Sequence, residues 1–298
     1  MIKILSPLLI LFAAILWGTA GTAQALAPSE VHPISIGAVR LFIGGGFLLM
    51  LVLATRRLRL NEIPYKIVIG AALCMALFQP FFFSAVSLTG VAIGTVVAIG
   101  SSPVLAGLIE MIILRKKPSK TWWISTLLSV VGVILLFSNQ GTTQVNPRGI
   151  LLALGAGLSF ASYTIINKKV VSSIPALPAV AVVFTISGLM LSPFLFIFHA
   201  TWVFTSDGLI TGLYLGVIVT GIAYFMFARG LANVDSSTAV TLSLAEPLTA
   251  TMLGVFMLGE AMSPLSWFGL ILVLLGIGVL ILSTVKKSKR FEAEYSNV

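Results

Sequence analysis

Three ionisable residues of this sequence lie inside long apolar stretches, where a charge is costly to place. Glu246 lies near the middle of one such stretch, Arg40 in the first half of another and Glu110 close to the end of a third. Buried charges persist in proteins when they are paired or do chemistry. A carboxylate such as Glu246 could exchange a proton or bind an ammonium group, and the guanidinium of Arg40 could bind a carboxylate or a phosphate.

Each of these residues also has a structural interpretation. The hydroxyls of Thr241 and Ser243 could satisfy the carboxylate of Glu246. Arg40 could bind backbone carbonyls, or it could pair with Glu246. For Glu110 we expect contact with the basic loop that follows it rather than with a ligand.

Uncharged polar and aromatic side chains in the same stretches could form the wall of a pocket. Binding pockets combine apolar walls with a few placed polar groups. For any single aromatic residue, packing or lipid contact is the competing interpretation. With Glu246 and Arg40, the predicted substrate-binding residues are Trp17, Gln24, Phe78, Gln79, Phe82, Tyr163, Asn167 and Tyr224.

The elements that carry these residues are too apolar for a water-soluble fold. The chain has 298 residues, of which 58% are hydrophobic and 9% charged, with a mean hydropathy of +1.10. Soluble domains carry about 25% charged residues, and a membrane-spanning helix needs about 20 apolar residues. We therefore predict an all-α polytopic membrane protein with about ten spans. The predicted spans are Ser6–Ala27, Pro33–Ala54, Tyr65–Val86, Val91–Leu114, Thr121–Ser138, Gly149–Ile166, Leu177–His199, Gly208–Arg229, Ser237–Leu258 and Leu265–Thr284.

The basic residues indicate how these spans are oriented. With ten spans, the termini and nearly all loop lysines and arginines share one side, and the opposite loops hold only Arg148. Cytoplasmic loops are enriched in Lys and Arg. We therefore predict a multi-pass protein of the inner cell membrane with both termini cytoplasmic. The net charge of +9 is then a topology signal, and nucleic-acid binding is excluded.

The chain contains an internal repeat. Val96–Leu136 matches Val240–Leu280 without a gap at a shift of 144 residues, and the first span matches the sixth at a shift of 143. Matched prolines and tryptophans at one spacing argue against chance similarity between apolar helices. The pairs include Pro103 with Pro247, Gly132 with Gly276, Trp123 with Trp267, and Trp17-Gly18-Thr19 with Phe160-Ala161-Ser162.

Five spans in each half place the second copy upside down relative to the first. We predict two inverted five-helix repeats, at residues 1–144 and 145–285, followed by a basic cytoplasmic tail at 286–298. Inverted repeats are typical of secondary transporters, whose substrate site lies near the membrane midplane between the halves.

Several short motifs resemble the EamA type of drug/metabolite transporter. They are Ala13–Thr19, Glu246-Pro247, Leu258-Gly259-Glu260 and the spaced glycines of Gly269–Gly278. The resemblance implies a cavity lined by spans one to four and six to nine, with spans five and ten outside it. It also implies export of amino acids or related small metabolites. One departure is that Leu114-Arg115-Lys116 stands where the first half would repeat Leu-Gly-Glu.

An intramembrane enzyme acting on a lipid or a small amphipathic substrate is the alternative. Protease chemistry needs a nucleophile with a base, or a metal cluster. The two histidines, His32 and His199, lie in a loop and at a span end, and the single cysteine, Cys74, has no partner. We therefore predict no enzymatic activity, no cofactor and no metal.

A gradient-driven carrier remains the favoured interpretation. A channel would show a continuous polar stripe or a charged ring, whereas the polar residues here gather at mid-depth. The sequence has no ATP-binding motif, so a solute or ion gradient must drive transport, and Glu246 could couple it to protons. Solute identity, direction, coupling ion and oligomeric state are not determined, and a homodimer formed through the outer spans is left open.

Overall fold

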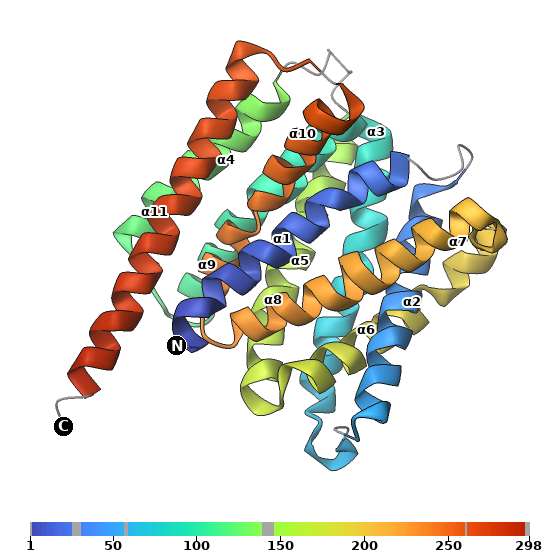
Figure 1. The fold of residues 1–298 in the computed structure, drawn as a ribbon, viewed down its shortest axis with the longest axis horizontal. Coiled ribbons are helices and arrows are strands. Elements are labelled where there is room, and N and C mark those ends of the chain that lie inside the picture. Colours follow the sequence, from blue (N-terminus) through green and yellow to red (C-terminus); the bar gives the residue numbers. More distant parts are fainter. Residues whose placement is uncertain (1, 26–30, 57–58, 139–145, 260, 296–298) are drawn as a thin grey trace.

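A computed structural model describes residues 2–25, 31–56, 59–138, 146–259 and 261–295. Within these ranges the chain is helical and contains no strand (Figure 1). The elements are α1 (Ile2–Ala25), α2 (Pro33–Ala54), η1 (Leu60–Glu62), α3 (Tyr65–Ile112), α4 (Lys120–Phe137), α5 (Pro147–Ser173), α6 (Ala176–Ile197), η2 (Ala200–Phe204), α7 (Ser206–Leu213), η3 (Tyr214–Ile222), α8 (Ala223–Leu231), α9 (Ser236–Leu242), α10 (Ala245–Leu258) and α11 (Pro264–Tyr295).

Ten helical segments among the described residues are long and apolar enough to cross a membrane. They coincide with the ten predicted spans to within a few residues, except that the sixth continues to Ser173. The predicted all-α membrane fold with about ten spans is confirmed. Four spans differ from single regular helices. Two of them share α3, which turns at Gly90 (φ 81°, ψ 161°). The eighth comprises α7, η3 and α8, and the ninth is divided between α9 and α10.

Local capping fixes where several helices begin. The side chains of Ser119, Asn146 and Thr205 accept hydrogen bonds from backbone N–H groups in the first turns of α4, α5 and α7. These N–H groups have no partner inside the helix, so such caps favour a helix start at these positions. At the other end, Gly259 ends α10 with a left-handed φ of 70°, which glycine adopts without a side-chain clash.

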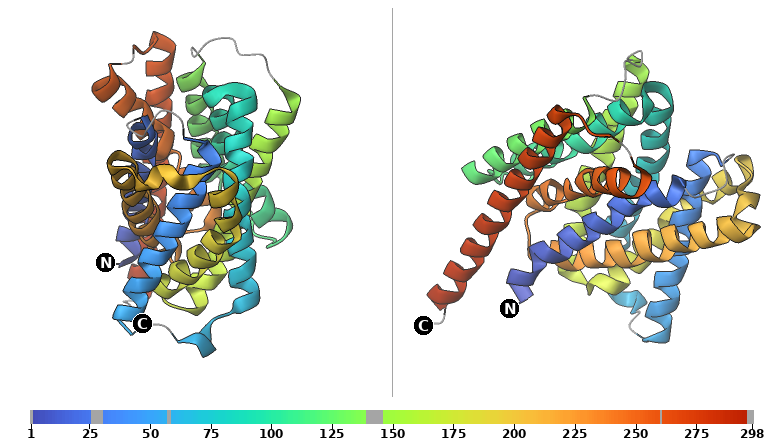
Figure 2. Two further views of the ribbon diagram at one scale, coloured as in Figure 1. Left: turned by 90° about the vertical axis from the view of Figure 1, so that its right-hand side faces the viewer. Right: turned by 45° about the horizontal axis from the view of Figure 1, so that its top comes forward.

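The two halves are arranged as inverted five-helix repeats, and equivalent helices pack against one another. Where α4 meets α11, a Cβ added to Gly132 would lie 2.7 Å from the carbonyl oxygen of Gly269, and one added to Gly276 would lie 2.7 Å from that of Ser125. A shift of 144 residues converts Gly132 into Gly276 and Ser125 into Gly269. The two close contacts are therefore equivalent, as an approximate twofold axis requires. Figure 2 shows α4 and α11 side by side in two further views.

The ends of the predicted repeats are only partly visible in the structure. The predicted boundary at residues 144 and 145 lies outside the described residues. The predicted tail, 286–298, begins inside α11, whose backbone is helical as far as Tyr295. Outside the spans, Arg59 and Glu62 form an exposed ion pair of 2.9 Å, and the hydrogen bond from Arg59 to Glu62 raises the pKa of the arginine.

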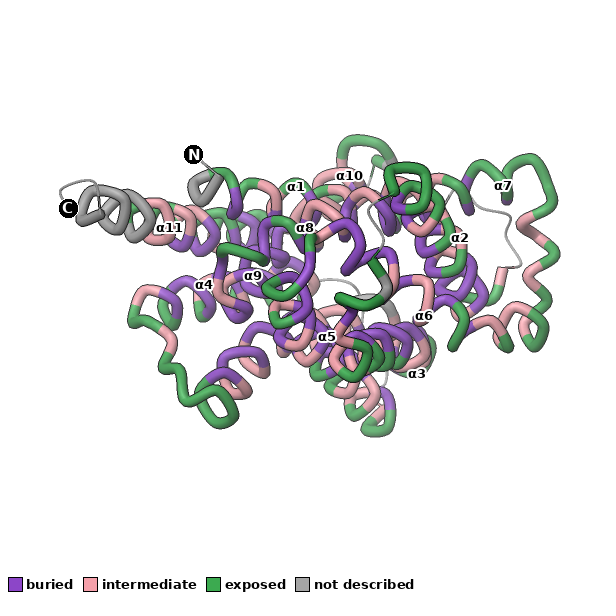
Figure 3. The backbone as a smooth tube through the Cα atoms, turned by 90° about the horizontal axis from the view of Figure 1, so that it is seen from below, coloured by how far each residue is buried: buried purple, intermediate pink, exposed green. Residues whose placement is uncertain are grey.

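A cluster of aromatic side chains occupies the centre of the protein where α1, α5, α6 and α8 meet. The ring of Tyr224 lies 4.6 Å from that of Trp17 and 4.5 Å from that of Phe184, measured between centroids. Phe227 lies 5.1 Å from Trp17. Buried residues lie on all four of these helices (Figure 3). Trp17, Phe160 and Tyr224 of this cluster form the floor of the cavity described below.

Candidate functional site

A cavity of about 390 Å³ lies between the two halves. Its wall comes from α1, α2, α3, α5, α8, the junction of α9 with α10, and the end of α4. This volume is near the lower end of the range for small-molecule pockets. Eight of the ten predicted substrate-binding residues line it: Trp17, Gln24, Arg40, Phe78, Gln79, Phe82, Tyr224 and Glu246.

The other two predicted residues, Tyr163 and Asn167, do not line this cavity. Both are completely buried on α5. The amide of Asn167 donates to the hydroxyl of Tyr163 at 3.2 Å. Tyr163 packs behind Tyr224, with 6.0 Å between ring centroids, so aromatic rings separate the pair from the cavity.

The carboxylate of Glu246 lies where the ninth span is interrupted. α9 ends before Ser243 and α10 begins two residues later, which places Glu246 in the first turn of α10. A negative charge is favourable at a helix N-terminus. The predicted hydroxyl partners are engaged elsewhere, because Thr241 bonds Thr126 (3.0 Å) and Ser243 donates to the carbonyl of Val240 (2.7 Å). Among the described residues, no hydrogen bond or ion pair holds this carboxylate.

Arg40 is held by a helix with an unusual hydrogen-bonding pattern. Its Nε donates to the hydroxyl of Thr220 at 3.2 Å, and Thr220 donates to the carbonyl of Leu215, five residues earlier, at 2.8 Å. This turn belongs to η3, a π-helical segment, and such segments are frequent at functional sites. Within the described part of the chain Arg40 makes no ion pair with Glu246, although both line the cavity. The cavity therefore holds a guanidinium and a carboxyl group that do not contact each other.

Two buried hydrogen-bond donors on residues that line the cavity have no partner among the described residues. They are Nε1 of Trp17 and Nε2 of Gln79. Leaving a buried polar group unsatisfied costs about 1–3 kcal/mol. Both nitrogens are shielded in this structure, so a solute would reach them only after their side chains shift, and the polar groups open to the cavity include the guanidinium of Arg40 and the carboxyl group of Glu246.

Sequence reasoning missed part of the cavity wall. Ser102 lines it and is the equivalent of Glu246 at the shift of 144, so the repeat could have indicated it. Phe137 lines it from α4, the fifth span, which the family resemblance places outside the cavity. No pattern in the sequence indicated the π-helical turn that holds Arg40. Glu110 contacts the basic loop through its backbone, because its carbonyl oxygen accepts a hydrogen bond from the N–H of Lys116 at 3.0 Å, while its carboxylate accepts hydrogen bonds from Ser237.

The cavity extends towards one end of the protein. Gln24, Pro33, Val86 and Phe137 line it, and all four lie within a few residues of the ends of their spans on the side that also carries Arg148. We call this the Arg148 end. The opposite end includes residues 55–56, 59–64, 113–119, 174–175 and 232–235 of the described chain, carries several basic loop residues and is called the basic end.

Comparison with known proteins shows the family. The model of the EamA-like transporter family matches the chain twice, at residues 4–138 and 147–282. The chain is 48% identical over 288 residues to the uncharacterized transporter YwfM of Bacillus subtilis (strain 168), covering 97% of each chain. It is 24% identical to the uncharacterized inner membrane transporter YicL of Salmonella typhimurium, covering 94% of this chain and 96% of that one. A protein of known crystal structure aligns with a TM-score of 0.81 and 23% identity over 94% of this chain and 98% of its own, a similarity of fold.

Proposed function

This chain belongs to the EamA-like transporter family, and we propose that it is a gradient-driven transporter that exports amino acids or related small metabolites by alternating access. A membrane transporter follows from the family and from the ten spans. The solute class, the direction and the mechanism are the proposal. It is supported mainly by one observation, the separation of Arg40 and Glu246 within one small cavity.

Opposite charges that share a cavity without contact suit a solute that carries both charges itself. The carboxylate of an amino acid would face Arg40, and its ammonium group would face Glu246. The donors of Trp17 and Gln79 would add hydrogen bonds to the carboxylate after their side chains shift, and the surrounding aromatic rings would accept an apolar side chain. Charge-assisted hydrogen bonds are roughly twice as strong as neutral ones, so these groups would dominate recognition.

Glu246 is also the proposed coupling group. Among the described residues its carboxyl group has no hydrogen-bond or ion-pair partner, and it lies at the break of a discontinuous span, where transporters commonly bind substrates and coupling ions. Opening and closing of the cavity would change its hydration and so its affinity for a proton. The orientation that fits this proposal places the basic end in the cytoplasm and the protein in the inner membrane.

Transport by purified protein in liposomes tests the proposal. We expect counterflow of radiolabelled amino acids, and identification of the recovered solute distinguishes a carrier from the alternative enzyme, which would alter it. Glu246→Gln should slow transport and remove its dependence on pH. Glu62→Gln is the matched control, because Glu62 is exposed and lies outside the spans. If pH-dependent transport persists in Glu246→Gln, then Glu246 is not the coupling group. If no amino acid in a full panel is moved, the solute class is wrong.

A further inference from the structure

Equivalent helices of the two repeats have different surroundings in this structure. α1 and α5 correspond at a shift of 143 residues, which pairs Trp17 with Phe160 and Gln24 with Asn167. Trp17 and Phe160 both line the floor of the cavity. Gln24 lines its wall towards the Arg148 end, whereas Asn167 is completely buried towards the basic end. The same position is therefore open to the cavity in one repeat and closed in the other.

The buried position retains an unused polar group. Within the described part of the chain, Oδ1 of Asn167 has no hydrogen-bond partner, and its amide nitrogen donates to the hydroxyl of Tyr163. A buried acceptor without a partner is costly in a static core. The unpaired atom is explained if, in another conformation, water or the donor groups of a solute bind to it. Asn167 would then line a cavity, as Gln24 does here.

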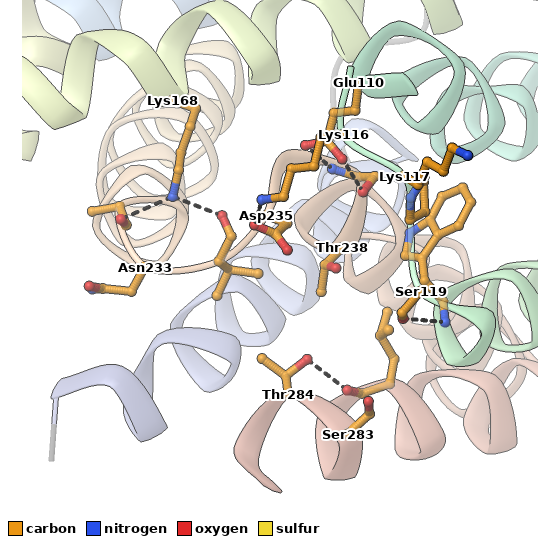
Figure 4. Close-up of a pocket in the computed structure, with 16 residues that line it drawn as sticks. Glu110, Lys116, Lys117, Ser119, Lys168, Asn233, Asp235, Thr238, Ser283 and Thr284 are labelled. Atoms are coloured by element: carbon orange, nitrogen blue, oxygen red, sulfur yellow. Dashed lines mark hydrogen bonds and ion pairs between the residues drawn. The ribbon is translucent and has the colours of Figure 1, made fainter. Parts of the chain in front are cut away.

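A second hollow lies at the basic end. Asn167 is seven residues beyond Phe160, which places it roughly 10 Å below the cavity floor at 1.5 Å per residue. The next residue, Lys168, lines a hollow of about 590 Å³ at the basic end. The residues that line this hollow are shown in Figure 4. Along α5, Tyr163 and Asn167 thus lie between Phe160, which lines the cavity, and Lys168, which lines the second hollow.

Polar contacts join the two halves at the basic end. Lys116 forms an ion pair with Asp235 (Figure 4). The carboxylate of Glu110 accepts hydrogen bonds from the hydroxyl and the backbone N–H of Ser237, at 2.5 and 3.3 Å. Glu110 and Lys116 belong to the first half, and Asp235 and Ser237 to the second. These contacts therefore cross the interface that has to separate if the basic end opens.

Lys168 of α5 binds the turn between α8 and α9, which also carries Asp235. Its Nζ donates to the carbonyl oxygens of Leu231, Ala232 and Val234 at 2.6, 3.0 and 3.0 Å. We call Glu110, Lys116, Asp235 and Ser237 the basic-end latch. At the Arg148 end, the repeat places only apolar or small residues at the positions equivalent to three of its members. Gly254 corresponds to Glu110, Val91 to Asp235 and Ile93 to Ser237, whereas the equivalent of Lys116 is Glu260, which lies outside the described residues.

We propose that Tyr163 and Asn167 line a second solute vestibule, which opens towards the basic end when the basic-end latch separates and the present cavity closes. Asn167 then offers its Oδ1 to an ammonium or hydroxyl group of the solute, as the counterpart of Gln24. The inference rests on the proposed transport function for its solute. Its conformational part is independent of which solute is carried.

Cysteine accessibility tests the vestibule without a known solute. In a Cys74→Ser background, which removes the single native cysteine, Asn167→Cys and Gln24→Cys are treated with a membrane-impermeant maleimide in vesicles of both orientations. We expect Gln24→Cys to react from the Arg148 end and Asn167→Cys to react slowly from the basic end. Adding Asp235→Asn should raise the rate at position 167 about two- to fivefold and lower the rate at position 24. That is the range allowed by the contribution of a partly exposed ion pair.

Control variants distinguish opening of the vestibule from local loosening of the structure. Ser125→Cys, buried between α4 and α11, should stay unreactive throughout. Thr164→Cys, also buried on α5, replaces Asn167→Cys if the latter does not fold. Position 167 staying unreactive from the basic end after Asp235→Asn, while position 24 reacts, would overturn the vestibule. A rise at position 167 with no fall at position 24 would also overturn it, because that indicates local loosening. Reciprocal labelling in a protein that moves no amino acid would support the vestibule and reject the solute class.

Discussion

Gly18→Ala is the sharpest test of how the cavity is built. Gly18 lies on α1 where this helix crosses α10 beside the cavity. A Cβ at this position would lie 2.5 Å from Cβ of Thr249 and 2.7 Å from the backbone carbonyl oxygen of Glu246. Gly21, one turn further along α1, also lines the cavity, and a Cβ there would meet nothing within 4 Å. Gly21→Ala is therefore the matched control.

The size of the effect follows from these distances. Ordinary van der Waals contact for a Cβ begins at 3.4 Å, so the contact with the Glu246 carbonyl is too short by about 0.7 Å. The neighbouring atom is backbone and cannot rotate away, so α1 and α10 must separate by a comparable distance. Overpacking of this kind costs about 1–3 kcal/mol. The same displacement moves Glu246 relative to Arg40 and should weaken solute binding.

Unfolding in detergent provides the first measurement, with the intrinsic fluorescence of the five tryptophans as the signal. We expect Gly18→Ala to lose about 1–3 kcal/mol of unfolding free energy and Gly21→Ala to remain at the wild-type value. In liposomes, Gly18→Ala should also transport more slowly than Gly21→Ala. Equal stability of the two variants would refute the inferred close approach of α1 and α10.

Further changes test other contacts. Gly276→Ala should destabilise the α4–α11 pair by about 1–3 kcal/mol, because its Cβ would lie 2.7 Å from the Ser125 carbonyl, while Gly278→Ala, with open space around it, should not. Trp202→Phe removes the 2.7 Å hydrogen bond to the buried hydroxyl of Ser35 and should cost about 1–3 kcal/mol, whereas the partly exposed Trp123 should tolerate the same change in a thermal melt. Glu62→Gln should have the same melting temperature as the wild type at each pH from 5 to 9. Because the pKa of Arg59 is raised, this side chain keeps its charge throughout this range, and any stabilisation by the Arg59–Glu62 ion pair would be lost only at much higher pH. A difference in melting temperature between variant and wild type that changes with pH would contradict this.

The sequence by itself determined the membrane fold. The length and hydrophobicity of its apolar stretches decided that ten helices cross the bilayer, because each backbone polar group must be satisfied within its own helix there. An odd number of spans in each matched half decided that the repeats are inverted. The scarcity of ionisable residues in the spans singled out Arg40 and Glu246, and both line the cavity.

Only the tertiary structure decided how these residues are held and which of them are accessible. The interruption of the ninth span and the π-helical turn at Thr220 depend on hydrogen bonds within and between helices, which a hydrophobic pattern does not record. Gln24 and Asn167 are equivalent amides in the sequence, yet one lines the cavity and the other is buried. That difference exists because two inverted halves share one interface and close it at one end, which is a property of packing between distant segments.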